Sequence, residues 1–136
     1  MAKQIGTFNN KTIFSDIDPD FGRNPKSGDL LLVKDERAIR LSISNLLKTS
    51  FGERLFRPNV GGSLRNLLFE PIDAITTLEI KDRILQTIRN HEPRVSRVDV
   101  DVISRAGQNS YEVNVEFSVR SSGSVNSLSV VLERIR

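Results

Sequence analysis

The stretch from Tyr111 to Val119 alternates strictly between apolar and polar residues, and this pattern constrains the fold more than any other feature of the sequence. Its apolar positions are Tyr111, Val113, Val115, Phe117 and Val119. Successive side chains of a strand point to opposite faces of a sheet, so a period of two predicts a strand with one buried and one solvated face. The sheet therefore needs a second layer on its apolar side.

Two more strands are predicted beside this one. The first comes before it, where valines at 98, 100 and 102 alternate with aspartates and a turn follows at 106–109. The second comes after a turn at 121–124 and is expected over 128–135. Its apolar side chains lie on both faces, with Leu128, Val130 and Leu132 on one and Val131 and Ile135 on the other. We expect the central stretch to be internal and the last strand to lie near an edge of the sheet.

Helices are predicted ahead of the strands. Residues 35–48 place five apolar side chains on one helical stripe, and Asp35 is the expected N-cap. Ser63 is expected to cap a short helix that carries Leu64, Leu67, Leu68 and Phe69 and that Pro71 ends. The loop between these two helices contains Gly61 and Gly62, which permit a tight turn.

A third helix is predicted from about Asp73 to Asn90. Its apolar residues recur at spacings of three, four and seven, which indicates one face packed on the sheet. They are Ile75, Leu78, Ile84, Leu85 and Ile88. Helices followed by a C-terminal antiparallel β-meander, with one helix packed on the sheet, predict an α+β fold.

Residues 1–29 differ in character from the rest of the chain. They are polar and rich in turn-forming pairs such as Asp18-Pro19 and Asn24-Pro25, with isolated apolar residues between them. These apolar residues are Ile13, Phe14, Ile17 and Phe21. We predict an extended N-terminal arm over 1–29 that docks at a few points, followed by a domain over 30–136. A loose tail is the alternative.

The composition excludes several classes of function. The 136 residues include no cysteine and one histidine, so thiolate chemistry and histidine-rich metal sites are not expected, and no cofactor is predicted. No apolar run is long enough for a membrane helix. The net charge is +3, and the arginines are scattered along the chain rather than clustered. We therefore expect neither a membrane nor a nucleic acid as a partner.

Glycoside hydrolysis is the one catalytic reading that the residues leave open, because it requires only two carboxylates. The candidates by type are Glu53, Glu70, Glu79 and Glu92. In Glu53-Arg54 and Glu92-Arg94 an arginine lies near the acid, which would lower the carboxyl pKa, whereas a general acid needs a raised one. We predict a protein without enzymatic activity, with a peptidoglycan-cleaving, lysozyme-like tail enzyme as the alternative.

Two groups of motifs carry a family resemblance. The first is Thr49-Ser50-Phe51-Gly52-Glu53-Arg54, followed by Pro58, Gly61 and Leu64-x-x-Leu67-Leu68-Phe69-Glu70-Pro71. The second is Glu92-Pro93-Arg94-Val95 at the end of the third predicted helix. In their order and spacing these motifs resemble the GPW-like baseplate wedge family, which includes the small wedge proteins of T-even-like phages and TssE of type VI secretion. The similarity spans about Asp35 to Val102.

The resemblance implies a structural component of a contractile-tail baseplate wedge, located in the virion tail baseplate and assembled in the host cytoplasm. Such a protein helps to assemble the baseplate and initiates polymerisation of the tail sheath by strand addition. The implied partners are other baseplate wedge proteins through their helical core bundle, the first ring of tail sheath subunits, and tail tube or hub proteins as further candidates.

The resemblance also implies where the partners bind. Glu92, Pro93 and Arg94 are the expected contact with the wedge, because proline fixes the exit of the chain and can hold both charges outward. A local ion pair at the helix end is the alternative. An arriving sheath arm is expected to pair with the last strand at Leu128, Val130, Val131 and Leu132. The alternative there is an ordinary edge strand that Glu133, Arg134 and Arg136 protect. Gly52, Glu53, Arg54, Pro58 and Gly61 form the family motif.

Overall fold

The structure is a computed structural model that describes residues 14–134. The predicted positions of Ile13, Ile135 and Arg136 lie outside the described residues, as does most of the first half of the predicted arm. The contacts within the chain divide it into two units, one ending at Ala38 and one beginning at Ile39.

The first unit contains a β-hairpin. Strand β1 (Ser15–Ile17) pairs antiparallel with β2 (Leu32–Lys34), and an isolated bridge joins Arg23 to Leu30. Turns between the strands include the predicted turn-forming pair at 18–19. Sequence reasoning did not identify this hairpin, because three-residue strands are too short for a pattern of alternation. Its second strand lies beyond residue 29, the end of the predicted arm.

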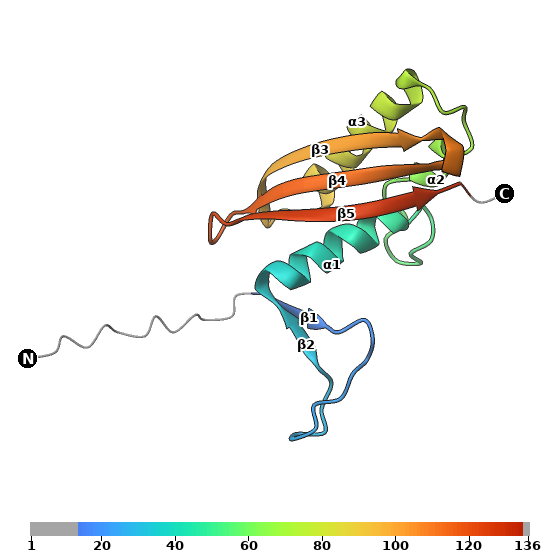
Figure 1. Cartoon of the computed structure of the whole chain (residues 1–136). Helices are drawn as coiled ribbons and strands as arrows, with labels where there is room; N and C mark the ends of the chain where they lie inside the picture. Colours follow the sequence, from blue (N-terminus) through green and yellow to red (C-terminus); the bar gives the residue numbers. More distant parts are fainter. Residues whose placement is uncertain (1–13, 135–136) are drawn as a thin grey trace, which may run out of the picture. The chain divides into compact units, whose positions relative to one another are not determined.

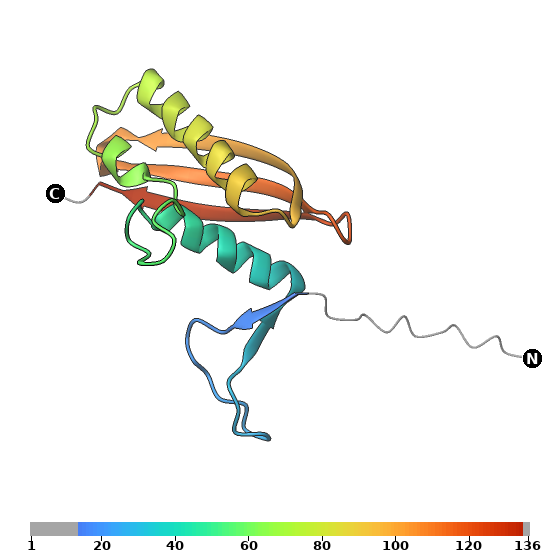
Figure 2. The same ribbon diagram turned by 180° about the vertical axis from the view of Figure 1, so that it is seen from behind.

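The second unit has two layers. Helices α1 (Asp35–Lys48, whose first four residues belong to the first unit), α2 (Leu64–Leu67) and α3 (Ala74–His91) precede strands β3 (Val95–Arg105), β4 (Ser110–Val119) and β5 (Val125–Glu133). The strands form an antiparallel sheet in the order β3-β4-β5, with a short 3₁₀ helix, Ala106–Gln108, between the first two. α1 and α3 lie on the same side of this sheet (Figure 1), as the reverse view in Figure 2 also shows. The α+β prediction is confirmed.

The core lies between the helices and one face of the sheet. All five alternating apolar side chains of β4 are buried, and β4 is the internal strand, as predicted. The register aligns the flanking strands with it: Val100 lies opposite Val115, and Val130 opposite Val113. Isoleucines of α1 and α3 cover this face, and the following are completely buried: Ile39, Ile43, Ile80, Ile84 and Ile88. One continuous apolar layer therefore holds the sheet to both helices.

Helix α3 starts as predicted but turns a different face inward. The Asp73 carboxylate accepts a hydrogen bond from the Thr76 N–H at 2.7 Å and caps the helix. This bond lowers the pKa of Asp73. Ile84 and Ile88 are buried, but the predicted core residues Ile75 and Leu78 are 69% and 62% exposed. Threonines occupy part of the inner face, and the Thr87 hydroxyl can be buried because it donates to the carbonyl of Arg83 at 2.7 Å.

Ser63 does not cap α2 in the predicted way. It occupies the N-cap position, but its side chain makes no capping bond and its backbone has a φ of 47°. Its Oγ atom instead accepts a hydrogen bond from the Phe51 N–H at 3.2 Å. Within residues 14–134, no helix combines the length and the apolar character that a membrane span requires.

Candidate functional site

The Glu92-Pro93-Arg94 segment closes the C-terminal end of α3. The Glu92 N–H donates to the Ile88 carbonyl at 2.8 Å, and Pro93 is exposed. The guanidinium of Arg94 binds both carboxylate oxygens of Glu92, with Nε to Oε1 at 2.5 Å and Nη2 to Oε2 at 2.6 Å. The Glu92 side chain is 1% exposed, whereas that of Arg94 is 27% exposed. The pairing of Glu92 with Arg94 is confirmed, but the expectation that both charges are held outward is wrong for Glu92, because its side chain is buried and only the arginine and the proline reach the surface.

The ion pair determines the charge of Glu92. Burial raises the pKa of this carboxyl, but hydrogen bonds from Arg94 and from Ser42 of α1, together with the charge of Arg94, outweigh that effect and bring the pKa below its ordinary value. Glu92 is therefore a carboxylate at neutral pH, which does not suit a general acid. The segment therefore contains a local ion pair at the helix end, which was the alternative expected from the sequence. A role of the segment in binding a partner stays a prediction.

The family motif forms a tightly folded loop between α1 and α2. The Gly62 N–H donates to the Thr49 carbonyl at 3.1 Å, and the Gly52 N–H donates to the Pro58 carbonyl at 2.8 Å. Gly61 has a φ of +135°, and a Cβ atom there would lie 2.4 Å from the Thr49 carbonyl oxygen. Only glycine fits this position. The motif therefore specifies a backbone conformation.

Glu53 and Arg54 do not form the ion pair that the sequence suggested. The Oε2 atom of Glu53 accepts a hydrogen bond from the Ser50 N–H at 3.0 Å, so the carboxylate stabilises the start of the loop. The ion pairs among the described residues are Arg94–Glu92 and Arg105–Glu112. Because Glu53 lies three residues after Ser50, its side chain reaches back to the backbone more easily than to its own neighbour.

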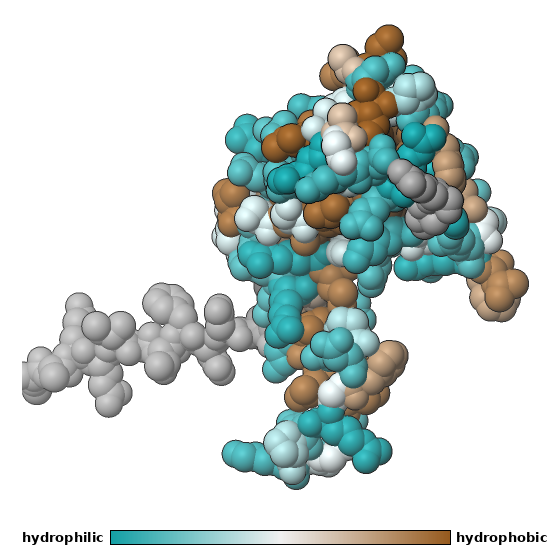
Figure 3. All heavy atoms as spheres, turned by 45° about the vertical axis from the view of Figure 1, so that its right-hand side comes forward, coloured by the Kyte–Doolittle hydropathy of each residue, from teal (hydrophilic) through white to brown (hydrophobic). Residues whose placement is uncertain are grey.

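The same loop exposes two large apolar side chains. Leu55 is 93% and Phe56 is 98% exposed, and both neighbours, Arg54 and Arg57, are exposed as well. The molecular surface carries several such apolar groups among hydrophilic ones (Figure 3). Sequence analysis missed this pair, although two apolar residues between arginines inside a polar loop are a detectable signal.

Strand β5 is an edge of the sheet, and its predicted pairing residues are all within it. Leu128, Val130 and Leu132 face the helices, whereas Val131 is 55% exposed on the open face. The strand runs over 125–133 rather than 128–135. It has one charged residue, Glu133, while the opposite edge strand β3 has four charged residues and is better protected against strand addition.

Two hydrogen bonds show which backbone groups of β5 point outward. The Val119 N–H donates to the Ser124 carbonyl at 3.0 Å, and the Arg134 N–H donates to the Asn109 carbonyl at 3.1 Å. Residues 124 and 134 therefore face β4, and the register between them runs without a bulge. Since N–H and C=O groups alternate sides along a strand, even-numbered residues pair with β4 and odd-numbered residues present their N–H and C=O groups at the outer edge.

A cavity of about 250 Å³ lies beside the C-terminal half of this edge. Its lining combines apolar and charged side chains from α1, α2, β5 and the segments on either side of α2. The apolar residues are Leu47, Leu64, Leu68, Val131 and Leu132, and the charged ones are Lys48, Glu53, Arg65 and Glu133. The described residues contain no group of three histidine, aspartate or glutamate side chains that could hold a metal ion.

Comparisons with known proteins decide the family. The sequence pattern of the family described as baseplate wedge protein gp25 matches residues 33–124. The baseplate wedge protein gp25 of Enterobacteria phage T4 is 31% identical over 107 residues, which cover 79% of this chain and 80% of the relative. The chain belongs to the gp25 family of baseplate wedge proteins. It is thus a structural baseplate wedge protein of contractile tail systems and a component of the tail baseplate.

Solved structures share the fold of this wedge protein. A Geobacter sulfurreducens protein provisionally named a tail lysozyme aligns with a TM-score of 0.72 and 26% identity, over 78% of this chain and 96% of that chain. A chain of the type VI secretion baseplate complex aligns with a TM-score of 0.60 and 14% identity, over 70% and 89% of the two chains. A chain of the anti-feeding prophage baseplate aligns with a TM-score of 0.57 and 21% identity, over 90% of this chain and 87% of that chain. The latter two likenesses concern the fold alone.

Proposed function

We propose that this wedge protein initiates the tail sheath, with the outer edge of β5 accepting an arm of a sheath subunit as an added strand. The observation that carries the proposal is the orientation of the β5 backbone, whose odd-numbered residues present, beyond the last strand of the sheet, N–H and C=O groups without a backbone partner among residues 14–134. Such an edge is a template for an incoming strand. Main-chain hydrogen bonds would provide affinity for an arm of almost any sequence.

The cavity beside Val131 and Leu132 would provide the selectivity. Alternate side chains of an added strand point to the helix side of the sheet, where the cavity opens between β5 and the ends of α1 and α2. Its leucine lining favours one apolar side chain in the arm, and Lys48 and Glu133, which also line it, favour polar neighbours. An arm with an apolar residue between polar ones fits this site.

Two further surfaces support binding to other wedge proteins rather than catalysis. Pro93 and the exposed part of Arg94 lie at the end of α3, and Leu55 and Phe56 offer apolar surface of the kind that protein interfaces bury. We propose that the protein has no enzymatic activity, because Glu92 is ionised and occupied by Arg94. Release of reducing sugars from purified peptidoglycan, abolished by Glu53→Gln or Glu92→Gln, would favour the lysozyme-like alternative instead.

A pair of proline substitutions tests the strand addition. Val131→Pro removes an outward N–H and leaves the ladder with β4 intact, so the protein should fold and the baseplates should carry bare tubes without sheath. Val130→Pro removes a bond to β4 and should destabilise the monomer by about 2–3 kcal/mol. Val131→Ala is the control that retains the N–H. Full sheaths on Val131→Pro baseplates in electron micrographs would disprove initiation at this edge.

A further inference from the structure

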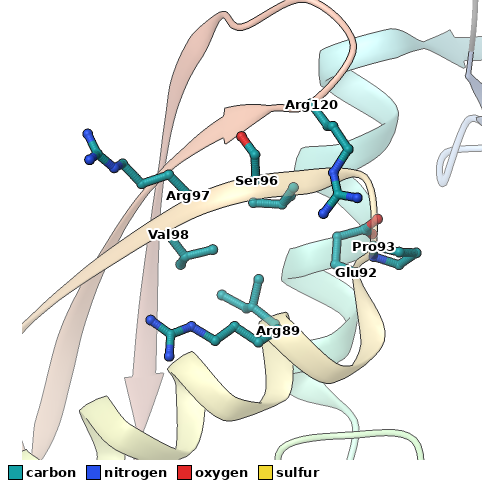
Figure 4. A pocket seen from close by; sticks show the side chains of 9 residues that line it. Arg89, Glu92, Pro93, Ser96, Arg97, Val98 and Arg120 are labelled. Carbon is teal, nitrogen blue, oxygen red and sulfur yellow. The ribbon is translucent and has the colours of Figure 1, made fainter.

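An arginine groove lies between the end of α3 and the start of β3, apart from the β5 edge (Figure 4). Its volume is about 480 Å³. Ile88, Val95 and Val98 contribute apolar side chains, and three arginines surround them: Arg89 of α3, Arg97 of β3 and Arg120, which follows β4. Figure 4 shows Arg89 and Val98 on one side of strand β3 and Arg97 on the other side, with Arg120 pointing toward Glu92. The groove thus combines an apolar floor with cationic walls.

No ion pair within the described part of the chain engages the three arginines of the groove, although Asp99 and Glu116 line a hollow next to Arg97. None of the side chains of Arg89, Arg97 and Arg120 forms an ion pair or a hydrogen bond with another described residue. Glu92 is the one carboxylate in the lining, and Arg94 already neutralises it through two hydrogen bonds. Three guanidinium groups therefore remain available to a ligand.

The backbone fixes the relative positions of these arginines. The register of β3 and β4 shifts between Val95 and Arg97, so Ser96 is an extra residue, and its hydroxyl lies 2.8 Å from that of Ser118. Such bulges change the direction of the neighbouring side chains. The Arg120 N–H donates to the Arg94 carbonyl at 2.9 Å, which ties the end of β4 to the start of β3. The groove is consequently part of the folded sheet and not a chance arrangement of loops.

We propose that the arginine groove binds a short acidic segment of a neighbouring baseplate protein. The planar guanidinium group pairs with carboxylates through two parallel hydrogen bonds, and the floor would take an apolar side chain between the acids. A nucleic acid fits less well, because Asp99 and Glu116 lie together with Arg97 around the adjoining hollow and would repel a continuous phosphate chain. The inference rests on the proposed function in one respect: the acidic segment belongs to a neighbouring wedge protein.

Charge reversal tests the groove in the assembled wedge. R89E, R97E and R120E should each weaken binding to the wedge proteins encoded with this chain by at least about tenfold, measured by biolayer interferometry. R83E is the matched control, since Arg83 is an exposed arginine of the same helix that does not line the groove, and it should change binding less than about twofold. Equal losses for all four variants would indicate a general charge effect and overturn the inference.

Zero-length coupling identifies the chemistry of the ligand. R97K retains the positive charge and adds an amine, so a carbodiimide should link position 97 to an aspartate or glutamate of a wedge neighbour, whereas R83K should give no such product. Absence of that crosslink would overturn the inference. So would a nucleic-acid result, in which R97E loses binding to single-stranded DNA while its binding to the wedge proteins is unchanged. If the wild-type chain binds no wedge protein at all, the proposed function itself fails; if it binds and the groove variants bind equally well, only the groove fails.

Discussion

Arg94 holds both carboxylate oxygens of Glu92, at 2.5 and 2.6 Å, although only one residue separates them in the sequence. Pro93 makes this possible, because its fixed φ turns the chain so that both side chains point the same way. The glutamate is buried and also receives a hydrogen bond from Ser42 of α1. The segment therefore joins the end of α3 to α1, in addition to any contact with a partner.

The first prediction follows from this burial. Arg94→Ala should reduce the free energy of unfolding by about 2–3 kcal/mol, because it leaves a buried carboxylate without its cation. The double variant Glu92→Gln/Arg94→Ala should lose less, since no buried charge remains. Urea unfolding of the wild type, of the single variants Arg94→Ala and Glu92→Gln, and of the double variant gives the coupling energy between the two side chains. A fully stable Arg94→Ala protein that fails to join the wedge would instead assign the arginine to the interface alone.

Stability should also depend on pH through Glu92. Its pKa is lower in the folded than in the unfolded chain, so its contribution is complete above the unfolded pKa of about 4.3 and is lost as the pH falls through the native pKa. The difference in unfolding free energy between wild type and Glu92→Gln should therefore shrink below about pH 4.3. The lowered pKa of Asp73 changes stability with pH in the same direction, but Asp73 is present in both proteins, so its contribution cancels in the difference. A difference that stays constant down to pH 3 would contradict this assignment.

A third prediction concerns the hydroxyl of Tyr111 in the core. Tyr111 is 2% exposed, and its Oη atom has no hydrogen-bond partner among the described residues. Burial, together with the Asp73 carboxylate, raises the pKa of this phenol. Tyr111→Phe removes an unsatisfied buried polar group and keeps the ring, so it should raise the free energy of unfolding by about 1 kcal/mol. A loss of similar size in urea unfolding would reveal a partner for the hydroxyl.

Regular patterns in the sequence predicted the elements that lie wholly against the core. The limits of α1 agree with the predicted 35–48, and the strand predicted over 111–119 differs from β4 by one residue. Such patterns failed where tertiary contacts determine which face of a helix is buried. Ile75 and Leu78 were expected in the core, but both are exposed, and buried threonines occupy part of the inner face of α3. The arginine groove could not be predicted, because its three arginines come from elements separated by up to 31 residues and meet only through the register of β3 and β4.

The loop of the family motif provides a matched pair of glycine substitutions. Both Gly52 and Gly61 have positive φ, but a Cβ atom at Gly52 would have no heavy atom within 4 Å, whereas one at Gly61 would collide with the Thr49 carbonyl. Gly52→Ala should cost only the backbone strain, on the order of 1 kcal/mol, while Gly61→Ala should cost more than twice as much because Thr49 must move and its hydrogen bond with Gly62 is disturbed. Thermal unfolding of the two variants, followed by circular dichroism, compares these costs directly. Equal melting temperatures would mean that the loop relaxes freely around position 61, and that the family motif does not specify the close approach of the chain to Thr49.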